Sequence, residues 1–259
     1  MITATATHYL GYVKRIMGLA KNITVKPISS KDAIKIIKQI HYSGLVINNS
    51  ILHFGVFIGG RCEGAISFGP SMDKKRMMAT IPGTGWSEFI ELNRMAFSES
   101  LPRNSESRAL GIVLRLIRKE YSHIKWVVSF SDGTQCGDGT IYRASGFNLI
   151  GIKKNSSLWR SPSGIVYSRM TLTAGLHGGR CEEARREAKR IIGDDAIKYN
   201  KGGASMKLFK AAGFIQLAGF QLKYIYFFDK DLRERESSKF IPFSEIERVG
   251  AKMYKGKRA

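Results

Sequence analysis

The stretch Trp126–Phe147, WVVSFSDGTQCGDGTIYRASGF, decides which fold we expect for this chain. Its first part, 126–132, begins with an apolar run, continues with alternating polar and apolar residues and ends at Asp132. This pattern is typical of a buried strand. A glycine-rich loop over 133–139 follows, and residues 141–145 are expected to form a short helix. A buried strand, an open loop and a helix in this order predict part of an α/β domain.

Asp132 has two interpretations at this point. Rigid strand ends that open into a loop often carry catalytic groups, so its carboxylate is a candidate catalytic group. Asp is also a common turn residue, whose side chain hydrogen-bonds to the backbone two residues further on. The stretch itself leaves both interpretations open.

Hydrophobic periodicity predicts the elements on either side of this stretch. Before it, we expect a strand at 23–27, a helix over 30–40, a hairpin turning at Gly59-Gly60, a surface loop over 72–85, a strand over 89–97 and a helix that begins at Ser105 or Ser107. After it, we expect strands over 147–152 and 165–172, a helix over 181–192, a helix–strand unit over 208–228 and a helix over 243–253.

The segment 208–228 has the same residue pattern as 141–154. Both contain an aromatic residue, a basic residue, Ala, a small residue, Gly and Phe, and then an expected strand. We interpret it as a second helix–strand unit that closes the sheet, which makes 175–203 an insertion. The expected organisation is an N-terminal segment (1–22), a main domain (23–228) and a basic C-terminal extension (229–259). The order of elements is similar to the GNAT N-acetyltransferase-like fold, which has helices on both faces of a central, mostly antiparallel sheet.

The strand expected over 89–97 carries a cation, Arg94. Alternation places Glu91 and Asn93 on one face and Arg94 on the other. A cation within a sheet is costly without a partner. Arg94 is therefore expected either to bind a phosphate or carboxyl-type donor group, or to form a structural pair with Glu91 or Asp132.

The charge of the chain indicates its partners. Its 259 residues contain 42 Lys and Arg against 21 Asp and Glu, a formal net charge of +21. Such an excess attracts polyanions, so we expect nucleic acid as the partner, with an anionic membrane surface as the second choice. No apolar run approaches the roughly 18 residues of a membrane span. Three widely spaced cysteines, Cys62, Cys136 and Cys181, are typical of free thiols in a reducing cytoplasm.

Several segments together resemble the Mom family of phage DNA-modification proteins. They are VKPISSKDA and HYSG (within 25–44), NNSILHFGVF (48–57), FGP (68–70), ELNRMAF (91–97), SESRALG (105–111), SFSDG (129–133) and IYRASGF (141–147). The resemblance implies conversion of adenine in double-stranded DNA to its N6-carbamoylmethyl (glycinamide) form in the host cytoplasm, which blocks host restriction enzymes. It also implies the acetyltransferase fold, and iron is associated with the family.

The resemblance adds roles for single residues. Asp132 is expected to hydrogen-bond the adenine N6 amino group and receive its proton, because the N6 lone pair is delocalised and N6 is a poor nucleophile. Tyr42 matches a functional position of the family, with a helix-end anchor as the alternative. His41 beside it could ligate iron with Asp132 or Tyr42, or simply cap a helix. Tyr142 matches the general-acid tyrosine of acetyltransferases, with a core aromatic as the alternative.

The donor site departs from the acetyltransferase pattern. Candidate donor-binding residues are Arg103, Ser105, Ser107 and Arg108, since a helix N-terminus there favours anions. However, Glu106 and Arg108 stand where CoA-using acetyltransferases have glycines, and a glutamate repels pyrophosphate. Ordinary acetyl-CoA binding is thus in doubt, and the donor stays open between acetyl-CoA, a host metabolite and an aminoacyl-type donor such as glycyl-tRNA.

Modification of N6 in a duplex requires the adenine to be flipped out or the duplex to be distorted. Trp159, Trp86 or Tyr42 could stack on such a base. Two basic loops are the expected DNA contacts. One contains Lys74, Lys75 and Arg76, and the other contains Lys153, Lys154, Trp159 and Arg160. The alternative for each loop is a solvated basic surface. Two competing functions are a CoA-dependent N-acetyltransferase for a protein or small amine, and a basic DNA-binding protein without catalysis.

Overall fold

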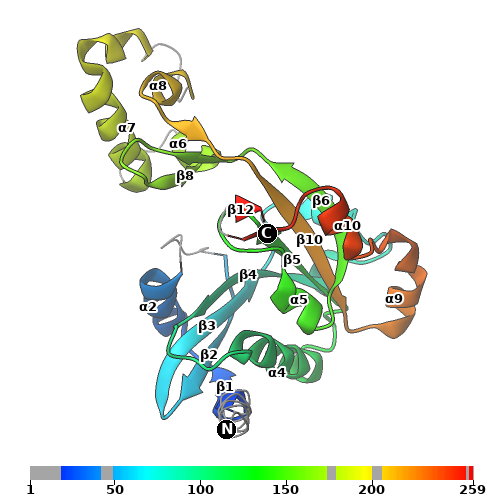
Figure 1. Ribbon diagram of the computed structural model, residues 1–259. Helices are drawn as coiled ribbons and strands as arrows, with labels where there is room; N and C mark the ends of the chain where they lie inside the picture. Colours follow the sequence, from blue (N-terminus) through cyan, green and yellow to red (C-terminus); the bar gives the residue numbers. More distant parts are fainter. Residues whose placement is uncertain (1–18, 42–48, 174–178, 200–205, 255–256, 259) are drawn as a thin grey trace, which may run out of the picture. The chain divides into compact units, whose positions relative to one another are not determined.

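The computed structural model in Figure 1 describes residues 19–41, 49–173, 179–199, 206–254 and 257–258. The chain divides into two compact units. Unit 1 contains Met1–Ser131, Gly139–Gly151 and Lys223–Phe243. Unit 2 contains Asp132–Asp138, Ile152–Leu222 and Ser244–Ala259. The segment boundaries expected from the sequence stay predictions.

A seven-stranded sheet in the order β1-β2-β3-β4-β5-β10-β6 forms the framework of unit 1. Strands β1 to β4 pair antiparallel, and β4 pairs with β5 in parallel. The strands are β1 (Thr24–Pro27), β2 (Leu52–Ile58), β3 (Arg61–Gly69), β4 (Phe89–Phe97), β5 (Trp126–Asp132), β6 (Asn148–Asn155) and β10 (Gly219–Phe227), of which the last three include residues of unit 2. The expected α/β fold with a mostly antiparallel sheet is confirmed.

The helices of unit 1 begin where local chemistry favours them. Ser29 caps α2, its side chain accepting a hydrogen bond from the Asp32 backbone N–H at 3.1 Å. Gly59 and Gly60 adopt positive φ angles of 56° and 80° in the expected β2–β3 hairpin. The α-helices are α2 (Ser30–Ile40), α3 (Lys74–Met78), α4 (Ser105–Glu120), α5 (Thr140–Ala144) and α9 (Lys230–Arg235), with short 3-10 helices η1 (Leu19–Asn22), η2 (Trp86–Glu88) and η4 (Ser237–Lys239).

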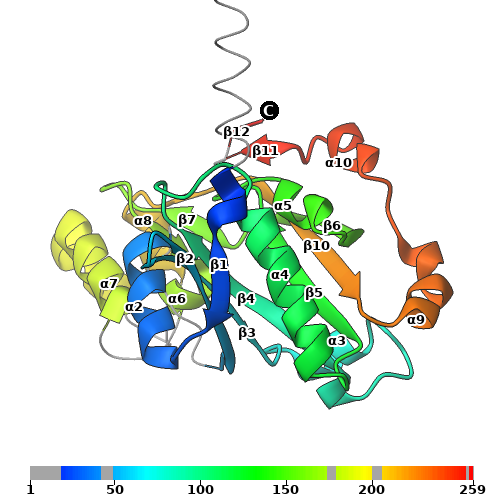
Figure 2. The ribbon, with the colours of Figure 1, turned by 90° about the horizontal axis from the view of Figure 1, so that it is seen from below.

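Helices cover both faces of this sheet, as expected. On β10, Ile225 packs in one cluster with Met77 of α3. The neighbouring residue Tyr224 points to the other face, where Tyr142 of α5 packs on it with ring centroids 5.1 Å apart. Figure 2 shows the long helix α4 beside β1, which it contacts.

A β-bulge in β4 changes which side chains share a face. Ser67 of β3 lies opposite Arg94, and Phe68 lies opposite Leu92, so Asn93 is the additional residue on β4. The bulge moves Arg94 onto the same face as Glu91. The alternation predicted from the sequence, with Arg94 on the face opposite Glu91, was therefore wrong from Asn93 onward.

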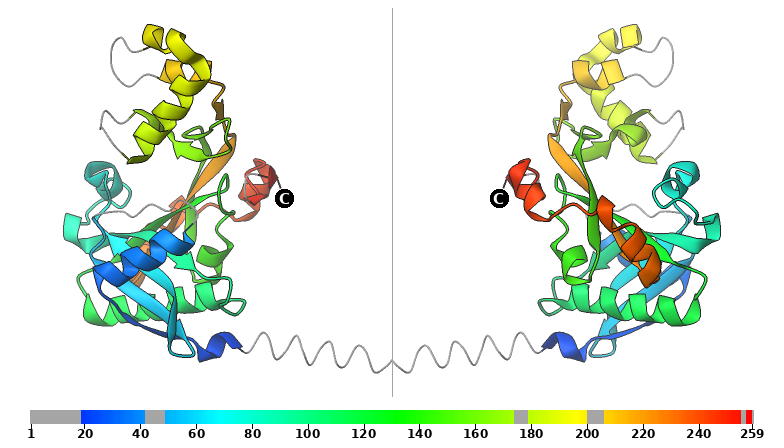
Figure 3. Two further views of the ribbon diagram at one scale, coloured as in Figure 1. Left: turned by 90° about the vertical axis from the view of Figure 1, so that its left-hand side faces the viewer. Right: turned by 90° about the vertical axis from the view of Figure 1, so that its right-hand side faces the viewer.

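Unit 2 has a separate small sheet and a core of its own. The sheet has the order β8-β7-β9, and the core contains Trp159, Leu172 and Phe209. Figure 3 shows α7 and α8 in two views, and these helices contact one another. The elements are β7 (Leu158–Arg160), β8 (Val166–Ser168), α6 (Arg169–Thr173), α7 (Gly179–Ile192), η3 (Gly193–Tyr199), α8 (Met206–Ala211), β9 (Ile215–Gln216), α10 (Ser244–Arg248), β11 (Met253–Tyr254) and β12 (Lys257–Arg258).

Three expected elements differ from the structure. The loop expected over 72–85 contains the helix α3, which the Asp73 side chain caps by accepting from the Arg76 backbone N–H. The strand expected over 165–172 is β8 followed by α6. The helix expected over 243–253 ends at Arg248 as α10, because Gly250 adopts a positive φ of 69° and the chain then becomes extended.

Candidate active site

Asp132 ends β5, and donors hold both oxygens of its carboxylate. Oδ1 accepts a hydrogen bond from the Thr134 backbone N–H at 2.9 Å, and Oδ2 accepts from Asn155 Nδ2 at 3.1 Å. The first bond is the turn cap that the structural interpretation expects. A turn does not require the second bond, which fixes the plane of the carboxylate. Each oxygen still has a lone pair with which it can accept a proton or a further hydrogen bond.

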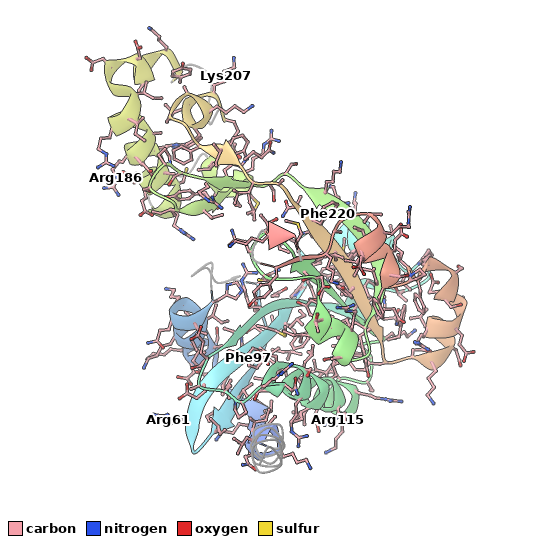
Figure 4. The ribbon with its side chains drawn as sticks, viewed as in Figure 1. Arg61, Phe97, Arg115, Arg186, Lys207 and Phe220 are labelled. Carbon is pink, nitrogen blue, oxygen red and sulfur yellow. The ribbon has the colours of Figure 1, made fainter. Side chains whose placement is uncertain are left out.

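The glycine-rich loop folds back on Asp132 within unit 2. The Cys136 backbone N–H donates to the Asp132 carbonyl oxygen at 2.8 Å. The Gly133 backbone N–H donates to the Phe220 carbonyl oxygen at 2.9 Å. Phe220 is labelled on β10 in Figure 4. A Cβ atom on Gly133 would lie 3.1 Å from Cβ of Met253. The loop is thus packed closely, and it is held in place by backbone hydrogen bonds.

A second polar cluster lies in unit 1 on the face that Glu91 and Arg94 share. Burial raises the pKa of the Glu91 carboxyl above its ordinary value, and the Ser71 hydroxyl, Arg94 and Lys223 only partly oppose this effect. Burial, followed by the charge of Arg94, lowers the pKa of His41 at the end of α2 to about 4. The cluster therefore contains a neutral imidazole near neutral pH and a carboxyl that ionises reluctantly.

Lys223 on β10 completes this cluster, and sequence reasoning missed it. Its Nζ donates to Thr80 Oγ1 at 2.6 Å. Burial lowers the pKa of Lys223 to about 8, with Arg76 and Lys239 acting in the same direction and Glu91 against it. A lysine inside the apolar run of β10 was the signal that could have identified it. Lysine and carboxyl groups perturbed toward their neutral forms are typical of functional sites, and also of structural networks.

Tyr142 is positioned as a core aromatic residue. Its side chain is 9% exposed, and its ring packs against Phe147 and Tyr224. Its hydroxyl donates to the Phe130 carbonyl oxygen of β5 at 3.5 Å. The general-acid role of Tyr142 stays a prediction. Tyr42 lies outside the described residues.

A cavity of about 530 Å³ lies beside the N-terminal half of α4 in unit 1. Two of the expected donor-binding residues, Ser107 and Arg108, line it together with Arg115, which Figure 4 labels on α4, and their role in binding a donor stays a prediction. Arg103 is exposed and is not part of the lining. Ser105 is fully buried, and its Oγ has no hydrogen-bond partner among the residues described. The other lining residues are Ala20, Lys21, Asn104, Gly111, Leu114, Ala144, Ser145 and Tyr226.

The residues expected at the site divide between the two units. Asp132 belongs to unit 2, whereas His41, Arg94, Ser107 and Tyr142 belong to unit 1. Their convergence on one site stays a prediction. Within unit 1, the structure brings His41, Arg94 and Glu91 together.

The described residues do not fit an iron site. No group of three His, Cys, Asp or Glu side chains with metal-binding geometry occurs in the part of the chain that the structure describes. Iron requires a larger ligand set than the expected pair of His41 and Asp132. No helix among the described residues is long and apolar enough to cross a membrane.

The expected DNA contacts differ in how accessible they are. Lys75 and Arg76 are exposed on α3, which begins at Lys74, and Lys153, Lys154 and Arg160 are exposed in unit 2. Trp159 is only 6% exposed and lies in the core of unit 2. Its ring packs with other core side chains, and Lys210 Nζ lies 5.7 Å from its centroid, so Trp159 is poorly placed to stack on a base. Trp86 is half-buried against Phe89.

Comparisons with known proteins place these observations in a family. A model described as the Mom protein family matches residues 22–245. Methylcarbamoylase mom of Escherichia phage Mu is 33% identical over 230 residues, which cover 88% of this chain and 85% of that protein.

Two solved acetyltransferase structures are similar over about half of the chain. IAA acetyltransferase from Bacillus cereus ATCC 14579 has a TM-score of 0.36 and 15% identity, covering 51% of this chain and 80% of its own. Ribosomal-protein-S18-alanine N-acetyltransferase from Escherichia coli has a TM-score of 0.37 and 12% identity, with coverages of 56% and 88%. Beyond the mixed α/β class that the sheet and its helices confirm, the expected acetyltransferase-like fold stays a prediction.

Proposed function

The chain belongs to the Mom protein family of phage DNA-modification proteins, and from this premise we propose that it converts adenine in double-stranded DNA to N6-carbamoylmethyladenine. In this proposal the protein is a transferase that acts in the cytoplasm of the host cell. The modified adenine protects the phage DNA from host restriction enzymes. Membership in the family supports DNA modification in general, and the product and its role are the proposal.

The hydrogen bonding of Asp132 is the observation that carries this proposal. Adenine N6 reacts poorly as a nucleophile while its lone pair is delocalised into the ring. A carboxylate removes this difficulty if it accepts the N6 proton while N6 bonds to the donor carbon and the donor's leaving group departs with its bonding electron pair. Asn155 and Thr134 each hold one oxygen of Asp132 and leave acceptor capacity for N6–H. Asp132 is the proposed general base, and Asn155 is a positioning residue.

The donor group is proposed to bind at α4. The cavity there has the cations Lys21, Arg108 and Arg115 in its lining, which favours a donor that carries phosphate. Glu106 in the first turn of α4 opposes a pyrophosphate at the helix N-terminus. This arrangement favours an aminoacyl-type donor such as glycyl-tRNA over acetyl-CoA.

The test is to express the protein with a plasmid, digest the plasmid DNA to nucleosides and determine their masses. Wild-type protein should add the mass of a glycinamide group to a fraction of the adenine. Asp132→Asn keeps the shape of the side chain but removes the proton acceptor, and we expect it to lower the modified fraction by about 10²- to 10⁴-fold. Asn155→Ala should have a smaller effect in the same direction.

Asp229→Asn is the matched control. It makes the same chemical change in unit 1, at the N-cap of α9, where Asn caps a helix as well as Asp. It should modify adenine like the wild type. Unmodified adenine with well-expressed wild-type protein would contradict the proposed function. Full activity of Asp132→Asn would contradict the assignment of the base, and an adenine that carries an acetyl mass would contradict the proposed product.

A further inference from the structure

The C-terminal hairpin lies on the glycine-rich loop that follows Asp132. Cβ of Met253 would meet a Cβ on Gly133 at 3.1 Å, and the ring of Tyr254 would meet a Cβ on Gly137 at 3.5 Å. All these residues belong to unit 2. The absence of a side chain on Gly133 lets β11 approach the loop closely, whereas Gly137 leaves ordinary van der Waals space beside Tyr254. A segment that the sequence presents as a charged tail is therefore a neighbour of the candidate base.

The hairpin is anchored on one side and presents an aromatic ring on the other. Met253 is 6% exposed, and the preceding Ala251 is fully buried, with its N–H donating to Ile246 of α10 at 2.8 Å. Tyr254 alternates with Met253 and is 61% exposed. Tyr254 therefore presents most of its side chain outside the core of unit 2.

The surroundings of Tyr254 are basic. Lys257 lies opposite Tyr254 in the β11–β12 pair, so the two side chains share one face of the hairpin. Lys252 is also exposed beside β11, where its Nζ pairs with Glu247 Oε1 at 3.4 Å. An exposed aromatic ring next to cations is the arrangement with which proteins bind unstacked nucleotides: the ring stacks on the base, and the cations contact the phosphates.

We propose that Tyr254 stacks on the adenine that is presented to Asp132, and that the face of the hairpin with Tyr254 and Lys257 binds the extruded nucleotide. This inference rests on the proposed function, because it assigns the base-binding residue for that reaction. It gives the stacking role to Tyr254 and not to the buried Trp159. The ligand class is a purine nucleotide in single-stranded or flipped-out form.

The test measures binding and modification separately. The binding probe is a fluorescein-labelled single-stranded oligodeoxyadenylate, followed by fluorescence anisotropy. Tyr254→Leu retains an apolar side chain but removes the ring, and it should weaken binding about tenfold. Tyr254→Phe keeps the ring and should bind like the wild type. Lys257→Ala should lower the salt dependence of binding by about one counterion.

Tyr121→Leu is the matched control, because it removes a ring from the end of α4 in unit 1. It should leave binding unchanged, and thermal melting of each variant checks that it is folded. The modified adenine fraction should fall in Tyr254→Leu and persist in Tyr254→Phe.

The two arms separate failure of the inference from failure of the proposed function. Wild-type protein that binds the oligonucleotide but leaves adenine unmodified contradicts the proposed function. Tyr254→Leu that binds and modifies like the wild type overturns the inference alone, and so does a wild-type protein that does not bind the oligonucleotide.

Discussion

At the scale of single residues, Lys223 links the polar cluster of unit 1 to a measurable pH dependence. The pKa of Lys223 is about 8 in the folded protein, whereas the pKa of a lysine in the unfolded chain has its ordinary value of 10.5. Between these values the unfolded chain binds more protons, so this group makes the free energy of unfolding rise with pH. Below pH 8 both states are protonated, and the cost of burying the charge is fully present.

We predict that Lys223→Met removes this rise. The difference in free energy of unfolding between wild type and variant should shift in favour of the wild type as the pH increases from 8 to 10. Urea denaturation at several pH values in this range measures it. Lys35→Met, which removes an exposed lysine from α2, is the control for loss of a positive charge. Parallel pH profiles for wild type and Lys223→Met would contradict the prediction.

At the scale of elements, strong periodicity made most of the sheet predictable. The hairpin at Gly59-Gly60, the strand over 89–97, the helix over 30–40 and the strand that ends at Asp132 all occur as expected. The helices α3 and α6 have only five residues each, too few for a periodic pattern to show. The bulge at Asn93 left no mark in the sequence, because it results from how β3 and β4 pair.

The same limits apply to the candidate site. Asp132 could be identified because a strand end followed by glycines is a local pattern. Asn155, which orients it, comes from another strand, and pairing across the sheet decides that contact. Tyr254 reaches the loop only through the path of the chain after α10, which composition described merely as a charged extension.

The glycine-rich loop contains two glycines that should respond differently to the same change. Gly139 has a φ of 84°, and a Cβ there would overlap the ring of Tyr224. Gly137 has ordinary space, with the nearest atom 3.5 Å from a Cβ. Gly139→Ala should lower the free energy of unfolding by about 2 kcal/mol or more. Gly137→Ala should change it by less than about 0.5 kcal/mol.

Urea denaturation of the two alanine variants tests this difference. Gly139→Ala should lower the free energy of unfolding by less in a Tyr224→Ala background than in the wild type. In that background the overlap is removed while the backbone strain remains. Equal stabilities of the two single variants would show that the loop conformation tolerates a side chain at Gly139.

At the scale of the whole molecule, the chain has separate hydrophobic cores. One core in unit 2 consists of side chains from β7, β8, α6, α7, α8 and the segments beside them. Another, in unit 1, joins α3, β4, β5 and β10. Separate cores favour local opening of one unit while the other stays folded. The sequence signal for the core of unit 2 was weak, since its strands have three residues or fewer.

We predict that a cavity in the core of unit 2 loosens that unit alone. Phe209 of α8 is 1% exposed, and Phe209→Ala should cost about 3–5 kcal/mol locally. Hydrogen exchange followed by mass spectrometry should then show faster exchange in α7 peptides and unchanged exchange in α4 peptides. Ile117→Ala, in the fully buried face of α4, is the reciprocal variant and should reverse the pattern. Faster exchange in both helices for either variant would show that the two cores unfold as one cooperative unit.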